Sequence, residues 1–192
     1  MLSNIRPAVA MIALFTLLTG LAYPLAVTGI AGALFRGQSG GELIRDASGQ
    51  VIGSHLIAQG FAKPEYLHPR PSAAGNGYDA SNSSGSNMGP LSQKLADRVK
   101  GDAAAIRKDA PGVTIPADAV TTSGSGLDPD ISPAYAHLQA PRIAVARHAD
   151  PAAVDAFVSA KTTPAFLGFI GQPRINVFDF NRALDVRFPV KR

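Results

Sequence analysis

The feature that most constrains this chain is an uncharged apolar run close to its N-terminus. No charged side chain occurs between Pro7 and Phe35, a stretch of 29 residues. A segment inside a bilayer must satisfy its own backbone hydrogen bonds as a helix, and about 20 apolar residues cross the hydrocarbon core. Arg6 and Arg36 flank the run, where their side chains would reach the lipid headgroups. The sequence therefore predicts a short flank at residues 1–6, a transmembrane helix over 7–35 and a soluble domain over 36–192.

A cleaved signal peptide is the rival interpretation of the same run. Ala31-Gly32-Ala33 resembles the small-residue pattern of a cleavage site, and Pro24 could kink the helix or end a short one. However, the apolar core of a signal peptide usually spans about 7–15 residues, far fewer than this run. We therefore favour a membrane anchor. The flanking charges do not decide its orientation, but a short leader before a long domain is the usual layout of proteins whose bulk lies outside the cytoplasm.

Residues 36–192 are numerous enough to bury the core of one domain. The chain holds 19 glycines and 15 prolines, which indicate many turns and ordered loops, and it has no cysteine to form a disulfide. Its formal net charge is +4, with no basic run, so composition gives no case for nucleic-acid binding.

Local patterns predict that this domain is of the mixed α+β class. Ser132-Pro133 and Asp150-Pro151 each place an N-cap residue before a proline and predict helix starts, and Pro141 should kink or split the first of these helices. The remaining expected elements are a strand or hairpin arm over 50–61, a loop over 63–90, a helix over 91–110, an extended segment over 113–120, a strand over 171–180 and a last short helix over 181–185.

Motifs of catalytic sites do not occur in the sequence. There is no Gly-Lys pair for a phosphate-binding loop, and Ser123 stands where a serine-hydrolase elbow around Ser125 would need glycine. The four histidines lie far apart and are more typical of surface or packing roles than of a zinc site; they are His55, His68, His137 and His148.

Two polar loops are unusual in composition. The first, over residues 70–90, is either a disordered linker or a loop ordered by residues such as Arg70, Tyr78 and Asn87. The second, over residues 121–133, combines glycines, hydroxyls and acids, and the residues alone favour a tight loop that caps the next helix.

An ordered set of short motifs resembles the C subunit of the Kdp-type high-affinity potassium-transporting ATPase of bacteria. The resemblance covers nearly the whole chain, beginning with a single N-terminal membrane helix. The motifs are Gly-Phe at 60–61, Arg-Pro-Ser-Ala at 70–73, Ser-Asn-Met-Gly-Pro at 86–90, Thr-Ser-Gly-Ser-Gly-Leu-Asp-Pro-Asp-Ile-Ser-Pro at 122–133, Arg-Ile-Ala-x-Ala-Arg at 142–147 and Gly-Gln-Pro-Arg-Ile-Asn-Val at 171–177, followed by Asn181, Ala183, Leu184 and Asp185. The departures are small: Gln93 and Lys94 replace a stretch that is often richer in Asn and Pro, and Phe180 replaces an aliphatic residue.

The resemblance implies a non-catalytic subunit of a pump that imports potassium. The implied partners are a potassium-selective pore subunit, a P-type ATPase subunit and a small hydrophobic subunit, in a bacterial inner membrane with this chain's domain outside the cytoplasm. The chain lacks the Asp-Lys-Thr-Gly-Thr sequence that carries the phosphate in P-type ATPases, so the catalytic aspartate would lie on another chain. A membrane-anchored extracytoplasmic binding domain or hydrolase is the alternative.

The resemblance also implies possible contact residues. Proteins of this family have been described as catalytic chaperones that raise the ATP affinity of the ATPase subunit, so ATP is implied only by resemblance; we expect no intrinsic cofactor, no metal and no catalytic residue. The candidates for contact with a partner or a nucleotide are Arg70, Ser72, Asn87, Gly89, Ser123, Gly124, Ser125, Gly126, Asp128, Arg142 and Arg174.

Overall fold

The computed structural model describes residues 2–190. Residue 1, in the predicted N-terminal flank, and residues 191–192, at the end of the predicted soluble domain, lie outside the described residues. The chain divides into two compact units, Met1–Ile52 and Gly53–Arg192. We describe each unit by itself.

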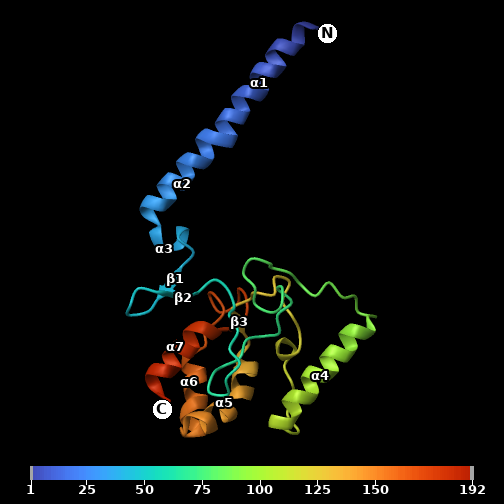
Figure 1. The fold of residues 1–192 in the computed structure, drawn as a ribbon, viewed down its shortest axis with the longest axis vertical. Helices are drawn as coiled ribbons and strands as arrows, with labels where there is room; N and C mark the ends of the chain where they lie inside the picture. The colour runs from blue at the N-terminus through green and yellow to red at the C-terminus, as the bar shows by residue number, and fades with distance from the viewer. Residues whose placement is uncertain (1, 191–192) are drawn as a thin grey trace. The chain divides into compact units, whose positions relative to one another are not determined.

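A long apolar helix dominates the first unit. A 3₁₀ turn, η1 (Leu2–Asn4), leads into α1 (Ile5–Leu17), a π-helical turn η2 (Leu18–Ala22) and α2 (Tyr23–Leu34), which are continuous in Figure 1. Together, Ile5–Leu34 form a helix that is long and apolar enough to cross a membrane, with a mean hydropathy of 1.9. The helix continues through Pro24 rather than ending there. The wider π turn lies just before this proline, where its ring would otherwise collide with a carbonyl of the preceding turn.

Short elements follow the long helix. A single turn, α3 (Arg36–Ser39), precedes β1 (Leu43–Arg45) and β2 (Val51–Ser54), which form a two-stranded sheet. Between them Asp46 Oδ1 accepts hydrogen bonds from the backbone N–H of Ser48 and of Gln50, at 2.8 and 3.0 Å. The expected strand or hairpin arm over 50–61 is therefore confirmed only for its first residues.

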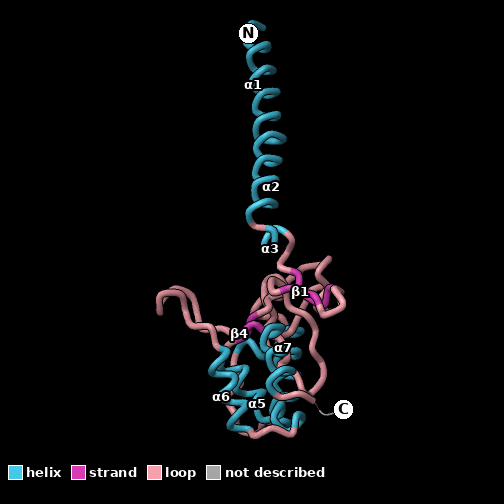
Figure 2. Tube along the Cα trace, turned by 90° about the vertical axis from the view of Figure 1, so that its left-hand side faces the viewer, coloured by secondary structure: helices cyan, strands magenta, loops and turns pink. Residues whose placement is uncertain are grey.

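The second unit packs three helices around one core. Helices α5 (Pro133–Arg147), α6 (Pro151–Lys161) and α7 (Val177–Arg187) lie side by side in Figures 1 and 2 and contribute to one buried cluster. Strands β3 (Asp130–Ile131) and β4 (Ile175–Asn176) form an antiparallel pair in which Ile131 lies opposite Ile175. The core includes Leu67, Ile143, Val154, Val158, Ile175, Phe180 and Leu184, each almost completely buried.

The capping signals place the helix starts. Ser132 accepts a hydrogen bond from the backbone N–H of Tyr135, and Asp150 accepts one from Ala152, so both predicted starts are confirmed. The helix expected over 91–110 is also confirmed as α4 (Gln93–Asp109), with Ser92 as its N-cap. The loop over 63–90 contains neither helix nor strand.

Three expectations need correction. The strand over 171–180 is wrong beyond Ile175 and Asn176, because the Asn176 side chain caps α7 and turns the chain into a helix that includes the expected 181–185 segment. The segment 113–120 contains no strand and ends in a 3₁₀ turn, η3 (Ala117–Ala119). Of the two effects expected of Pro141, a kink or a split, the split is wrong, because α5 runs unbroken from Pro133 to Arg147. Pro141 removes one backbone hydrogen bond of the helix, a loss that the rest of this 15-residue helix tolerates.

A candidate partner-binding surface

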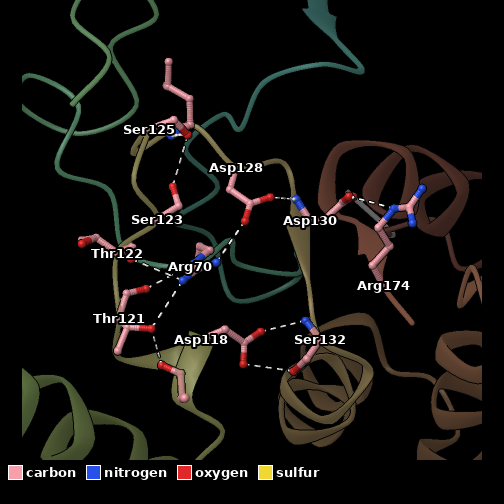
Figure 3. Close-up of polar contacts among 12 residues, drawn as sticks. Arg70, Asp118, Thr121, Thr122, Ser123, Ser125, Asp128, Asp130, Ser132 and Arg174 are labelled. Carbon is pink, nitrogen blue, oxygen red and sulfur yellow. Dashed lines mark hydrogen bonds and ion pairs between the residues drawn. The ribbon is translucent and has the colours of Figure 1, made fainter. Parts of the chain in front are cut away.

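Arg70 joins the two polar loops that the sequence singles out (Figure 3). Its Nη1 donates to Asp128 Oδ2 at 2.9 Å, and its Nε and Nη2 lie 3.3 Å from the backbone carbonyls of Thr121 and Thr122 respectively. A guanidinium group presents its donors in a fixed planar fork, so these bonds fix both loops relative to one side chain. The side chains of the ion pair are only 22% and 32% exposed, which shields the charges from water.

Ser72 makes a second junction between the loops. Its hydroxyl donates to the Gly126 carbonyl at 2.6 Å and accepts hydrogen bonds from the N–H groups of Ala74 and Tyr78. Gly126 has a φ of +67°, and a Cβ built there would lie 2.5 Å from the carbonyl oxygen of Ser84. Only glycine allows both this backbone angle and this approach.

The serine-rich segments are paired through their backbones and hydroxyls. The Ser125 carbonyl accepts from the Ser84 N–H and from the Ser83 hydroxyl, both at 2.9 Å, while the Ser125 hydroxyl accepts from the Leu127 N–H. The Ser123 and Ser125 hydroxyls lie 3.3 Å apart (Figure 3). Gly124 lies against Gly85, where a Cβ would come within 3.0 Å of the Gly124 carbonyl oxygen. These contacts favour the ordered-loop interpretation over a disordered linker.

A polar cavity of about 470 Å³ lies beside Arg70. Its charged groups are paired: Arg174 Nε contacts Asp130 Oδ2 at 3.0 Å, and Asp118 accepts from the N–H and hydroxyl of Ser132 (Figure 3). Burial raises the pKa of Asp130, against the opposing effect of Arg174. Because both arginines already contact carboxylates, the cavity presents no unpaired cation among its described residues for a phosphate group.

The structure thus brings most of the predicted residues together, but not all of them. Arg70, Ser72, Ser123, Gly124, Ser125, Gly126 and Asp128 form one polar assembly, with Arg174 across the cavity. Asn87 and Gly89 lie on the exposed segment that leads from this assembly to α4. Arg142 lies elsewhere, on α5, where it donates to the backbone carbonyls of Pro64 and Tyr66 and lines a separate cavity of about 840 Å³.

Two buried amides support the loop that carries Arg70, and sequence analysis gave them no such role. Asn181 accepts from the Leu67 N–H at 2.8 Å and donates to the Leu67 carbonyl at 2.9 Å. Gln139 makes the same pair of bonds with His68, at 2.8 and 3.0 Å. Side chains from α7 and α5 therefore replace the neighbouring strand that an extended segment would otherwise need. Both amides stand among apolar helix residues, which is the signal that would have identified them.

A serine, a histidine and an aspartate also meet on the surface of α5 and α6. His137 Nδ1 lies 2.5 Å from Asp155 Oδ1, and its Nε2 lies 3.5 Å from the Ser159 hydroxyl. This resembles a hydrolase triad in connectivity, but Ser159 sits inside a helix whose N–H groups bond within the helix and cannot form an oxyanion hole. Neither cavity described above is lined by these residues. Among the described residues, no group of three or more His, Cys, Asp and Glu side chains could hold a metal ion.

Comparison with known proteins relates the chain to one family. The family model described as "K+-transporting ATPase, c chain" matches residues 5–186. A potassium-transporting ATPase KdpC subunit of Caulobacter vibrioides is 65% identical over 189 residues, covering 98% of this chain and 96% of the relative. The corresponding protein of Beijerinckia indica is 60% identical and that of Rhodospirillum rubrum 53% identical, and for each at least 98% of both chains is covered.

Proposed function

This chain belongs to the KdpC family, the c chain of the K+-transporting ATPase, and from that premise we propose that it is a non-catalytic accessory subunit of an ATP-driven potassium uptake pump. Its partners would be the pore subunit that selects potassium, the P-type ATPase subunit and a small hydrophobic subunit. K+ is then the transported ion of the complex rather than a cofactor of this chain.

We assign the membrane anchor to Ile5–Leu34, which is long enough to span a bilayer and whose described side chains are exposed apart from a half-buried Ala31. The proposed site is the inner membrane, with the domain over 36–192 outside the cytoplasm. The chain contains no cysteine, so a single cysteine at exposed Ala104 reports orientation directly. It should react with a membrane-impermeant maleimide in intact spheroplasts; reaction only after lysis would overturn the proposed orientation.

We name the two polar loops, residues 70–90 and 121–133, the double-loop surface. The observation that supports a binding role is the Arg70 junction, which ties two long, mostly irregular loops to each other. Loops fixed in this way present a preformed surface, which lowers the entropy lost on binding. We propose that it docks on the outer mouth of the pore subunit, where it stabilises the complex and shapes the potential that entering potassium meets.

A role in ATP binding as a catalytic chaperone is the weaker proposal. The three arginines considered for it are engaged within the chain: Arg70 with Asp128, Arg174 with Asp130 and Arg142 with backbone carbonyls. A nucleotide would have to displace these contacts. We therefore favour the interface with the pore subunit.

The test is co-purification in mild detergent of the C-terminally tagged chain from potassium-starved cells that express the whole complex. Ser125→Arg and Asn87→Arg each place a bulky charge on an exposed position of the double-loop surface. We expect both to reduce recovery of the pore and ATPase subunits and to weaken apparent potassium affinity. Ala104→Arg, an exposed site on α4, is the charge-matched control and should behave like the wild type. Wild-type assembly and potassium affinity in both loop variants would rule out the docking role.

A further inference from the structure

A short apolar hairpin projects from the second unit between α6 and β4 (Figure 2). We name residues 163–174 the apolar finger. Thr163 pairs with Arg174 at its base and Phe166 pairs with Ile170 near its tip. Four large apolar side chains at the tip are mostly exposed: Phe166 at 68%, Leu167 at 70%, Phe169 at 77% and Ile170 at 50%. Exposed apolar clusters of this kind mark sites of contact with another surface.

The backbone of the turn at the tip is strained, and no contact within the described part of this chain compensates for that strain. Leu167 and Gly168 have φ values of +53° and +83°, as in a type I′ turn, where Asn-Gly is the favoured pair. A leucine in the left-handed region costs free energy, and its side chain gains no burial in return. The Leu167 side chain therefore points outward at the tip of the finger. Backbone strain of this kind persists at sites that bind another surface, so we infer that Leu167 contacts a surface outside this chain.

The segment that carries the finger has no acidic residue of its own, and of the two basic residues that flank it Arg174 is paired with Asp130. No acidic residue occurs between Asp155 and Asp179, and the uncharged stretch from Thr162 to Pro173 is flanked by Lys161 and Arg174. A protein interface normally has a polar rim that supplies hydrogen bonds, but the tip Phe166–Ile170 carries no polar side chain at all. Aromatic and aliphatic side chains bordered by cations are instead typical of segments that enter the headgroup region of a bilayer.

We propose that the tip of the apolar finger inserts into the lipid headgroup region of the membrane that holds the long helix. The proposal rests on the membrane anchoring proposed above. The finger acts as a second, shallow contact: the helix keeps the domain near the bilayer, so even weak partitioning of four side chains is sufficient to orient the domain. Lys161, next to the base of the finger, would then meet lipid phosphates, whereas Arg174 at the base is already paired with Asp130.

The experiment places a single fluorophore on the full-length chain, which has no native cysteine. Phe169→Cys is labelled with bimane and reconstituted into vesicles of phosphatidylethanolamine and phosphatidylglycerol, with lipids brominated in the upper acyl chain as quenchers. We expect a blue-shifted emission and loss of fluorescence with the brominated lipids. Val186→Cys, at a similarly exposed apolar position on α7, is the matched control and should keep its emission. Adding Phe166→Ser to the labelled chain should reduce the quenching, while the melting temperature stays unchanged because Phe166 lies outside the core.

The outcomes separate this proposal from the anchoring on which it rests. If the chain fails to float with the vesicles, anchoring fails, and the finger proposal fails with it. If the chain floats but residue 169 is not quenched, only the finger proposal is overturned. Equal quenching at 169 and 186 would show adsorption of the whole domain and would also overturn it. In the purified complex, an unquenched bimane at 169, together with crosslinking to another subunit when Phe169→Cys carries a photoreactive maleimide instead, would assign the finger to a protein partner.

Discussion

Gly126 occupies the most constrained backbone position of the double-loop surface. A methyl group there would meet the Ser84 carbonyl and the Ala74 N–H, at 2.5 and 2.6 Å, on a residue whose φ is +67°. We expect Gly126→Ala to destabilise the chain by roughly 2–4 kcal/mol, since left-handed strain and overpacking add. Gly89→Ala, where no atom lies within 4 Å of the new methyl, should have little effect. Thermal unfolding of the purified chain in detergent measures both, and equal melting temperatures would contradict the packing argument.

The strain at Leu167 predicts a change in the opposite direction. Asparagine tolerates the left-handed region better than leucine, and Leu167 is mostly exposed, so little burial is lost on replacement. We expect Leu167→Asn to stabilise the isolated chain by about 0.5–1 kcal/mol. A lower melting temperature in the same detergent assay would mean that Leu167 makes stabilising contacts within the chain.

His68 makes stability depend on pH. Burial lowers the pKa of His68, and the nearby Arg142 acts in the same direction, so the folded state favours the neutral ring, while the unfolded ring titrates near the ordinary histidine pKa of 6.5. Below that pH the unfolded state binds the proton more readily, so folding stability falls as the pH decreases. We expect the melting temperature of the wild type to fall relative to His68→Gln between pH 7.5 and 5.5. A pH-independent difference between the two proteins would show that His68 does not titrate differently on folding.

At the scale of elements, local signals in the sequence located helix starts but not the strand-to-helix change at Asn176. Ser132-Pro133 and Asp150-Pro151 determine their helices through neighbouring atoms, which a sequence displays directly. The sequence predicts a strand over 171–180, yet Val177, Phe180, Asn181 and Leu184 are buried at helical spacing. The difference is set by the Asn176 cap and by packing against α5 and α6, contacts that lie far away in sequence.

In the candidate site, too, local sequence predicts some features, while contacts between distant residues set the others. Their glycines, hydroxyls and one arginine make the two loops unusual in composition, and in the structure the two loops contact each other. That Arg70 pairs with Asp128, rather than remaining free, depends on a contact across 58 residues. The supporting amides of Gln139 and Asn181 depend on separations of 71 and 114 residues.

Asn181 gives a prediction about how elements are held together. It satisfies both backbone groups of Leu67 from α7, so Asn181→Leu leaves an N–H and a C=O buried without partners. We expect a loss of roughly 3 kcal/mol in the free energy of unfolding. Asn82→Leu, at an exposed loop position, is the control and should change stability little. A similar small change for both variants would show that water replaces the amide.

At the scale of the whole molecule, the two units differ in how their apolar residues are covered. The helix residues of α1 and α2 include no buried residue, and side chains such as Leu14 and Ile30 are more than half exposed. By contrast, every member of the main core cluster lies at or beyond Leu67, and the partly buried residues packed against it begin at Phe61. The core of the second unit is therefore complete without any residue of the first.

This separation predicts that residues 53–192 fold without the long helix. The fragment should be monomeric in buffer without detergent and unfold cooperatively, at a temperature close to that of the same domain in the detergent-solubilised full chain, because removal of the first unit takes away no core contact. The full chain should need detergent or lipid, since about thirty residues of uncovered apolar helix would otherwise associate in water. Calorimetry and sedimentation velocity measure the two properties. A fragment that aggregates or melts without cooperativity would show that the first unit, or the subunits that bind it, completes the fold. A soluble, cooperatively unfolding fragment that no longer co-purifies with the pump would show instead that the anchor serves assembly rather than folding.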